Sequence, residues 1–197
     1  MCGISGFFLN KEKKKSEVIY KETLALMSKK ISHRGPDNNN LWYDLDNQIY
    51  FGHNRLKIID LSDAGNQPIF SYTGKFTIIY NGEIYNHIEI KKKLLKESKN
   101  SINFKSETDT EILINAIDFW GLKRTLNEIN GMYSFAIWNK EEKVLTLCRD
   151  RFGEKPLYYF FNDEGLFFSS EIKSFSCLKV SEKISLKNLD YFKYYGY

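Results

Sequence analysis

The sequence predicts an α+β fold in which antiparallel sheets are stacked and covered by helices. Short apolar segments with strand-like composition occur in two groups, at residues 3–80 and at residues 131–170. Two segments with the spacing of amphipathic helices, at 83–97 and 108–121, lie between these groups. Helices placed between groups of antiparallel strands are typical of the α+β class.

The first part of the chain opens with a strand and a helix. Residues 3–9 (GISGFFL) are apolar and predict a buried strand. Residues 13–31 place Leu24, Met27 and Ile31 at helical spacing. The following elements are expected to be a loop at 32–40, strands at 41–45 and 48–60, a loop at 61–68 and a strand at 75–80.

The pair Asn81-Gly82 is ambiguous, because Asn-Gly usually marks a hairpin turn. The segment after it has helical spacing, so we expect the pair to end a strand without starting a hairpin. Asn86, with Glu89 three residues later, resembles a capping box at the start of that helix. The next helix begins near Thr108 and is expected to end at Gly121.

The last third of the chain predicts strands and a thin tail. Four strands are expected as an antiparallel meander, at 131–139, 143–150, 156–162 and 165–170. A short helix follows, and few core residues remain from residue 181 onward.

Composition disfavours several classes of protein. The 197 residues are 42% hydrophobic, enough for one globular core. The net charge of +4 comes mostly from lysines in solvated segments, without the aromatic interleaving of nucleic-acid readers. Three cysteines without CxxC spacing argue against a zinc site or a disulfide framework. No apolar run reaches the roughly 20 residues that span a bilayer and no signal peptide is seen, so we expect a cytoplasmic protein.

Cys2 is the first candidate for chemistry. If Met1 is removed, Cys2 carries both a thiol and the α-amine of the chain. An α-amine has a pKa of about 7.7–8.0, so part of it is neutral at pH 7 and can accept the thiol proton. The alternative is a small apolar residue in an edge strand, and position alone leaves both interpretations open.

Three further segments would complete an amide-cleaving site. Asn81 and Gly82 offer a side-chain amide and an unhindered backbone N–H to an oxyanion, although a strand-ending turn explains them too. Arg55 has the geometry to hold a carboxylate. Asp109 either interacts with the dipole of its helix or faces a substrate ammonium. An arginine and an aspartate together would fit a free α-amino acid.

Nine motifs occur along the chain in the order found in one family: MCGISGFF, SHRGPD, HNRLKIIDLS, GNQP, YNGEIYN, SETDTEIL, GMYSFAIWN, RDRFGEKPLYY and SSEIKS. Together they resemble the N-terminal glutaminase domain of glutamine-dependent asparagine synthetases, which are class II glutamine amidotransferases of the N-terminal-nucleophile hydrolase superfamily. The resemblance covers nearly the whole chain and implies a four-layer αββα fold. SHRGPD and RDRFGEKPLYY are more similar to the asparagine-synthetase branch than to glucosamine-phosphate synthase or the purine-pathway amidotransferase.

The resemblance also implies roles for individual residues. Cys2, freed of Met1, would be the nucleophile and its amine the proton shuttle. Asn81 and Gly82 would form the oxyanion hole, and Arg55 would hold the α-carboxylate of glutamine. The groups around the bound amino acid would be Arg55, Leu56, Ile58, Ile59, Asn81, Gly82, Glu83 and Asp109, with Leu56, Ile58 and Ile59 contributing backbone groups.

The resemblance implies a glutaminase domain at residues 2–180 and the start of a linker at 181–197. Relatives continue into a synthetase domain that uses ATP and magnesium to amidate aspartate, and its SGGxDSS-type loop does not occur here. The glutaminase half-reaction itself needs no metal or cofactor. The expected partners are L-glutamine and a synthetase domain, in the same chain or in trans, with a homodimer left open and neither nucleic acid nor membrane expected.

Two alternatives stay open. The ammonia could amidate a sugar or another carboxylate, as in surface-polysaccharide pathways. A chain with a blocked N-terminus could instead be a non-catalytic binding domain.

Overall fold

Two antiparallel sheets form the centre of the protein. The computed structural model describes residues 1–10, 16–178 and 185–196. The strands of the first sheet are, in spatial order, β2 (Asn38–Asp44), β3 (Ile49–Arg55), β1 (Gly3–Leu9), β9 (Gly165–Ser169) and β8 (Tyr158–Asn162). The strands of the second sheet are β4 (Ile69–Phe70), β5 (Phe76–Ile84), β6 (Gly131–Asn139) and β7 (Val144–Arg149).

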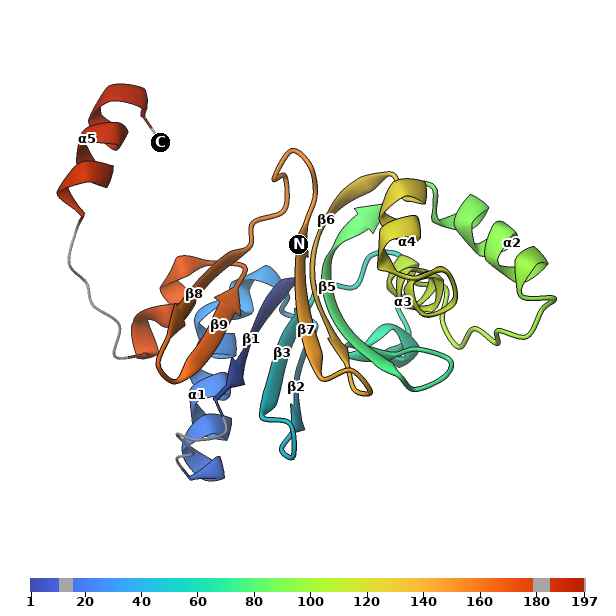
Figure 1. Ribbon diagram of the computed structural model, residues 1–197, viewed down its shortest axis with the longest axis horizontal. Helices are drawn as coiled ribbons and strands as arrows, with labels where there is room; N and C mark the ends of the chain where they lie inside the picture. The colour runs from blue at the N-terminus through green and yellow to red at the C-terminus, as the bar shows by residue number, and fades with distance from the viewer. Residues whose placement is uncertain (11–15, 179–184, 197) are drawn as a thin grey trace.

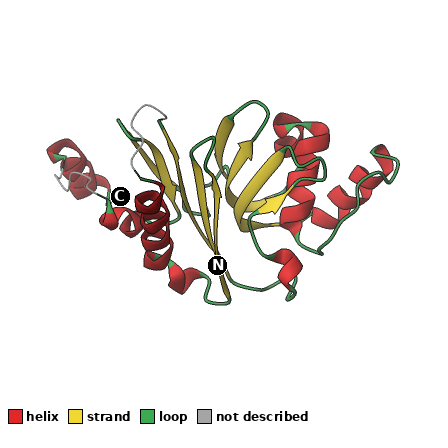
Figure 2. Cartoon of the chain, turned by 90° about the horizontal axis from the view of Figure 1, so that it is seen from below, coloured by secondary structure: helices red, strands yellow, loops and turns green. Residues whose placement is uncertain are grey.

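Helices cover the outer face of each sheet. The first sheet is covered by α1 (Glu17–Lys30) and the 3₁₀ helix η4 (Ile172–Cys177). The second sheet is covered by α2 (His87–Glu97), α3 (Asp109–Trp120) and α4 (Leu122–Glu128). Short 3₁₀ turns η2 (Ser32–Arg34) and η3 (Asp63–Gly65) lie in the connections. The result is a four-layer αββα sandwich, with strands between helices on both sides (Figures 1 and 2). The predicted α+β class is confirmed.

Strand alternation divides the apolar residues among three layers. On β1, Ile4 faces the second sheet, whereas Phe7 packs under α1 against Tyr50. On β5, Ile79 faces the first sheet, whereas Ile78 packs under the helices. The layer between the sheets is built from Ile4, Ile49, Phe51, Ile79, Ala136, Trp138 and Phe168. Burial of this layer fixes which side chains of each strand face the gap between the sheets.

Several predicted elements are confirmed. The strands at 3–9 and 131–139 have the predicted bounds. Helix α3 begins after Thr108, whose hydroxyl accepts the N–H of Glu111, and ends at Gly121, where φ is +81°. Of the predicted helix at 13–31, residues 13–15 lie outside the described part of the chain.

Other expectations were wrong at the ends of strands. The strand predicted at 48–60 ends at Arg55, and β2 begins at Asn38 inside the predicted loop. Strand β5 continues through Asn81-Gly82 to Ile84, because β6 pairs with it along this whole length. Tertiary pairing here overrides the turn preference of Asn-Gly.

Two local predictions also failed. Asn86 makes no side-chain cap on α2; its amide instead donates to the Glu128 carbonyl and accepts the N–H of Asn130. The predicted meander divides between the sheets, with β6 and β7 in one and β8 and β9 in the other. Strand alternation is the same in both sheets, so local pattern could not assign these strands.

The C-terminal part contains helix α5 (Leu186–Tyr195), which lies apart from the two sheets in Figure 1. Its apolar side chains Leu186, Phe192 and Tyr194 are exposed. The domain boundary predicted at residues 180 and 181 falls outside the described residues. Within those residues, no helix is long and apolar enough to cross a lipid bilayer.

Packing between the sheets makes a stability prediction. Phe168 is fully buried between them, whereas Phe161, on the adjacent strand, is 78% exposed. Phe168→Ala should lower the free energy of unfolding by about 3–5 kcal/mol, because it leaves a cavity in the core. Phe161→Ala, the matched control, should change it by no more than about 0.5 kcal/mol. Urea unfolding measures both, and equal effects would contradict the layer assignment.

Candidate active site

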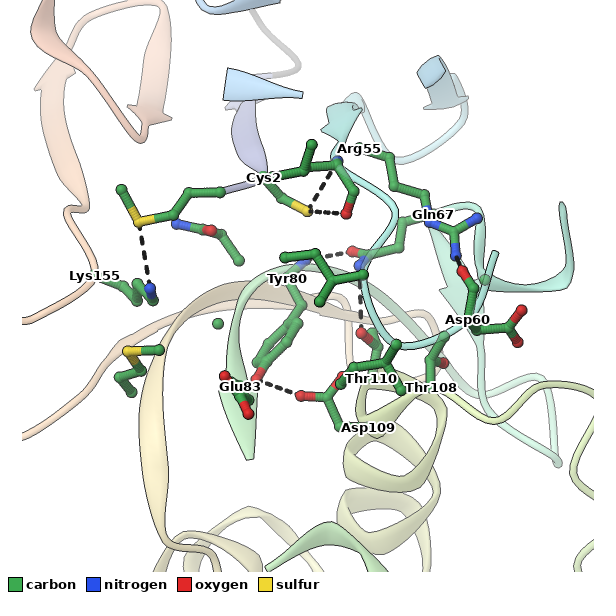
Figure 3. A pocket seen from close by; sticks show the side chains of 18 residues that line it. Cys2, Arg55, Asp60, Gln67, Tyr80, Glu83, Thr108, Asp109, Thr110 and Lys155 are labelled. Carbon is green, nitrogen blue, oxygen red and sulfur yellow. Dashed lines mark hydrogen bonds between the residues drawn. The ribbon is translucent and has the colours of Figure 1, made fainter. Parts of the chain in front are cut away.

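A cavity of about 180 Å³ opens at one end of the two sheets (Figure 3). Its lining residues are Met1, Cys2, Arg55, Leu56, Ile58, Ile59, Asp60, Gly65, Gln67, Tyr80, Asn81, Gly82, Glu83, Thr108, Asp109, Thr110, Met132 and Lys155. Every residue that the sequence suggested for nucleophile, oxyanion hole or substrate binding is among them. The structure thus brings together groups that are up to 107 positions apart in the sequence, from Cys2 to Asp109.

Strand register explains why these groups meet. Strand β1 pairs with β3 so that Gly3 lies opposite Asn54, which puts Cys2 near Arg55. The alternation that sends Phe51 and His53 toward the second sheet sends Arg55 to the same side. On β5, the alternation that directs Ile79 into the gap directs Asn81 there as well. The alternation that places apolar side chains in the core therefore also determines the direction of the Arg55 and Asn81 side chains.

The Cys2 thiol is half-buried and lies directly before the first residue of β1. Its Sγ accepts the N–H of Leu56 at 3.4 Å and lies 3.8 Å from the Leu56 carbonyl. Burial raises the pKa of the Cys2 thiol, while the Leu56 N–H, the N-terminal ammonium and Arg55 oppose that rise. The net pKa is raised, so at neutral pH this thiol needs a base to become a nucleophile.

Asn81 lines the cavity and carries a buried side-chain donor. The residue is 1% exposed, and its Nδ2 has no hydrogen-bond partner within the described residues. Leaving a buried amide donor unpaired costs about 1–3 kcal/mol. An unpaired donor that lines the same cavity as a thiol is well suited to bind a developing negative charge.

The Gly82 N–H points to the same cavity edge. Tyr133, its partner on β6, donates its N–H to the Asp150 carboxylate and accepts the Asp150 N–H, so Gly82 and Tyr133 do not exchange backbone bonds. The N–H groups of Tyr80 and Ile84, two residues to either side, face the same edge as that of Gly82. They donate to Gln67 and Asp109, respectively. The N–H of Gly82 lies between these two occupied donors.

Gly82 also allows the two strands to approach. A Cβ built at this position would lie 2.4 Å from the Met132 carbonyl oxygen and 2.7 Å from the Tyr133 Cα. A side chain here would therefore push β6 away and widen the site.

Arg55 is already engaged with the loop that follows it. Its Nη1 donates to the Ser62 carbonyl at 2.7 Å and to Asn66 Oδ1 at 2.8 Å, and its Nη2 donates to the Asp60 carbonyl. The guanidinium thus folds residues 56–66 over one side of the cavity. These bonds leave the Nε hydrogen and one Nη2 hydrogen without a partner in the described part of the chain.

Three apolar residues of that loop line the cavity. Leu56, Ile58 and Ile59 all line it, although the side chain of Ile58 is mostly exposed to solvent. They were predicted as part of a strand, but the strand ends at Arg55. Backbone polar groups that no sheet uses remain able to bind a ligand.

Asp109 lies at the first turn of α3 and is 4% exposed. Its Oδ2 accepts the Tyr80 hydroxyl and the Ile84 N–H, both at 2.9 Å. Burial raises the pKa of the Asp109 carboxyl, and these two hydrogen bonds oppose the rise. Glu83, on the same side of the cavity, is exposed to solvent.

A partly buried arginine outside the cavity holds the backbone of Cys2 in place. Arg34 donates through Nε to the Cys2 carbonyl at 3.0 Å and through Nη1 to the Glu171 carboxylate at 3.0 Å. Lys173 and His33 also contact Glu171. Arg34, which precedes β2, and Glu171, which follows β9, therefore hold the backbone of Cys2 in place.

Sequence reasoning missed several lining residues, notably Gln67, Tyr80, Met132 and Lys155. Gln67 is buried and bridges β5 to α3, accepting the Tyr80 N–H and donating to Thr110. Gln67 and Lys155 lie in the motifs GNQP and RDRFGEKPLYY, so the signal was present. Nothing in their spacing, however, says that they meet Cys2.

The αββα sandwich, with a cysteine at the start of a central strand, shares its fold with a solved amidotransferase. The B. subtilis glutamine phosphoribosylpyrophosphate amidotransferase structure, complexed with ADP and GMP, superposes with a TM-score of 0.63 at 19% identity. This match covers 89% of this chain and 43% of that one. A family model described as a glutamine amidotransferase domain matches residues 1–197. The chain belongs to the glutamine amidotransferase domain family.

Two curated relatives carry different names. Asparagine synthetase [glutamine-hydrolyzing] 3 of Bacillus subtilis is 36% identical over 88% of this chain. Amidase chry2 of Gibberella zeae is 33% identical over 96% of it. The chain spans only 27% and 28% of these relatives, about a quarter of their length.

The Glu171 cluster makes a pH prediction. Burial raises the pKa of Glu171, but hydrogen bonds from Arg34, Lys173 and His33 outweigh it and lower the pKa from 4.5 to about 2. A depressed folded-state pKa stabilises the fold above the unfolded pKa, and this stabilisation is lost as the pH falls toward 2. Glu171→Gln should therefore lower the free energy of unfolding by about 1–2 kcal/mol at pH 7, after allowance for partial exposure, and by much less near pH 2.5.

Denaturant unfolding at both pH values measures this difference. The control is Glu141→Gln, at an exposed carboxylate that pairs with Lys75. It should change the free energy by at most about 0.5 kcal/mol. A Glu171→Gln penalty of equal size at both pH values would contradict the ionic origin of the effect.

Proposed function

We propose that this chain hydrolyses L-glutamine to glutamate and ammonia, with Cys2 as the nucleophile. The observation that carries the proposal is the convergence of the Cys2 thiol, the unpaired Asn81 amide and the free edge of Gly82 on one cavity. A nucleophile facing two hydrogen-bond donors fits acyl transfer from an amide.

Removal of Met1 is the first requirement of this function. With Met1 present, the α-amine belongs to Met1, and the Met1 side chain lines the cavity beside Lys155. Its removal would give Cys2 a free amine next to its own thiol. The raised pKa of the Cys2 thiol makes such a base necessary.

The reaction then divides into two acyl transfers. The amine takes the Sγ proton, and Sγ bonds to the amide carbon of glutamine, placing negative charge on its oxygen. Asn81 Nδ2 and the Gly82 N–H stabilise that oxyanion. The C–N bond breaks as the ammonium gives its proton to the leaving ammonia. Water, deprotonated by the same amine, attacks the thioester, and glutamate leaves as the thiol takes back its proton.

The charges around the cavity fit the ends of an α-amino acid. The remaining hydrogens of Arg55 would bind the α-carboxylate, while Asp109 and Glu83 would face the α-ammonium. The backbone of Leu56, Ile58 and Ile59 would bind the same part of the substrate. Hydrolysis by these residues calls on no metal or cofactor.

We propose further that the ammonia serves a synthetase part that uses ATP and magnesium to amidate aspartate, attached beyond residues 181–197 or acting in trans. The name of the Bacillus subtilis relative, and the fact that this chain spans about a quarter of it, support this assignment. A fungal relative is named an amidase and not a synthetase, so a different ammonia-using reaction, such as amidation of a sugar or another carboxylate, is the second candidate. Amidation of aspartate by the full-length protein would decide between them.

A non-catalytic domain with a blocked N-terminus is separable from both. Intact-mass spectrometry of the purified chain measures whether Met1 is retained. A fully retained Met1 together with no release of glutamate would contradict the proposed function.

Cys2→Ala should abolish the release of glutamate from glutamine by the chain without Met1, because no other group replaces the nucleophile. The matched control is Cys148→Ala, at a partly buried cysteine packed under the helices of the second sheet. It should retain most of the activity. Release of glutamate by the Cys2→Ala protein at the wild-type rate would exclude the mechanism.

Asn81 and Arg55 should have different kinetic effects. Asn81→Ala removes a donor to the transition state, so kcat should fall about 100-fold while KM changes little. Arg55→Ala removes binding of the carboxylate and the tie to the following loop, so KM should rise at least about tenfold. Steady-state kinetics distinguish the two, with Asn139→Ala, at the far end of β6, as a control. Reversed effects would contradict the assigned roles.

A further inference from the structure

Lys155 is a buried lysine in the wall of the candidate site. The residue is 6% exposed, and its Nζ donates to the Met1 thioether at 3.3 Å (Figure 3). No ion pair in the described part of the chain includes this ammonium. Burying a charge without an opposite charge costs several kcal/mol, so its position needs an explanation.

The turn that carries Lys155 is tightly held. The Asp150 carboxylate accepts the backbone N–H groups of Phe152, Glu154 and Lys155, at 2.9–3.1 Å. Arg149 Nε donates to the Lys155 carbonyl at 2.8 Å. This turn is fixed on both sides, so the backbone that carries Lys155 is held in place beside the N-terminus.

The other charged and titratable groups that face the cavity are Cys2, Arg55, Asp60, Tyr80, Glu83 and Asp109. Arg55 is bound to loop carbonyls, and Asp60 accepts the N–H groups of Ser62 and Glu107. Asp109 is bound by Tyr80 and Ile84, and Glu83 is solvated. Among the described residues that line the cavity, Lys155 is the cation whose side chain contacts Met1.

Resting on the proposed function, we propose that Lys155 is a positioning residue for the N-terminal base. Once Met1 is removed, its ammonium lies beside the α-amine of Cys2 and disfavours the protonated form of that amine. Like charges at short range oppose one another's formation, so more of the amine is neutral and able to take the Sγ proton.

The direct test is titration of the Cys2 amine. The chain is released from a cleavable N-terminal fusion, so that Cys2 is the first residue, and is labelled with [¹⁵N]cysteine. Of its three cysteines only Cys2 then carries an amine, and its ¹⁵N shift reports protonation by NMR. Lys155→Met should raise the titration midpoint by about one unit, and Lys155→Arg should restore it. Lys155→Gln provides a second neutral variant should Lys155→Met fail to fold.

The kinetic test uses the same proteins. The acid limb of the kcat/KM profile should move to higher pH in Lys155→Met, with about a tenfold loss near pH 6.5 and little loss at pH 9. Lys75→Met, at a surface ion pair just before β5, should leave the profile unchanged.

The outcomes separate the two proposals. An unchanged amine midpoint in the neutral variants overturns the role of Lys155, whether or not the chain hydrolyses glutamine. A loss confined to KM, with an unchanged pH profile, overturns it in favour of substrate binding. A raised midpoint in a chain that shows no glutaminase activity supports the role of Lys155 while contradicting the proposed function.

Discussion

The candidate site depends on the central position of β1 in the first sheet. Chain termini usually fray, and a frayed residue cannot hold a nucleophile in a defined geometry. Here β1 pairs with β3 on one side and β9 on the other, which leaves neither of its edges open. Arg34 then holds the carbonyl of Cys2 itself. The residue at the end of the chain therefore gains the order of a core strand.

The wall of the cavity across from Cys2 is formed by β5, a strand that is only partly paired on one side. Strand β4 pairs with β5 only at Thr77 and Ile78, so the later N–H groups of β5 face no strand on that side. Gln67 and Asp109 occupy two of them, and Gly82 lies between. An unpaired sheet edge is usually a liability that proteins cover. In this protein, covering all but one donor converts the edge into a candidate oxyanion site.

Much of the fold could be predicted from local pattern, whereas the pairing between distant segments could not. Apolar spacing predicted β1, β6 and α3 closely because those elements also bury their apolar faces in the native packing. The bounds of β5 failed because Asn-Gly favours a turn locally, while nine consecutive pairs with β6 keep the strand extended. Likewise, alternation predicted β8 and β9 but not their sheet, which depends on the pairing of β9 with the distant β1.

The same distinction holds for the candidate site. The residues first suggested by chemistry all line the cavity: Cys2, Arg55 and Asp109 lie at or next to the ends of elements, whereas Asn81 and Gly82 lie within β5. The sequence suggested only that Arg55 binds a substrate carboxylate. The structure shows that its guanidinium also holds the loop that follows it. The candidate role of Lys155 could not be predicted from its own segment, because that role depends on a contact with Met1, 154 residues away.

Activation of the thiol is constrained by its surroundings. Burial raises the pKa of the Cys2 thiol, and Asp109 contributes in the same direction. The thiol is therefore mostly protonated at neutral pH. His53 is poorly suited to act as the base, because burial lowers its pKa to about 3 and its Nε2 faces the Tyr80 carbonyl. In the proposed function the proton goes instead to the α-amine that Cys2 gains when Met1 is removed. An ordinary α-amine is only partly neutral at pH 7, so the proposed role of Lys155, a cation beside this amine that increases its neutral fraction, complements a thiol whose own pKa is raised by burial.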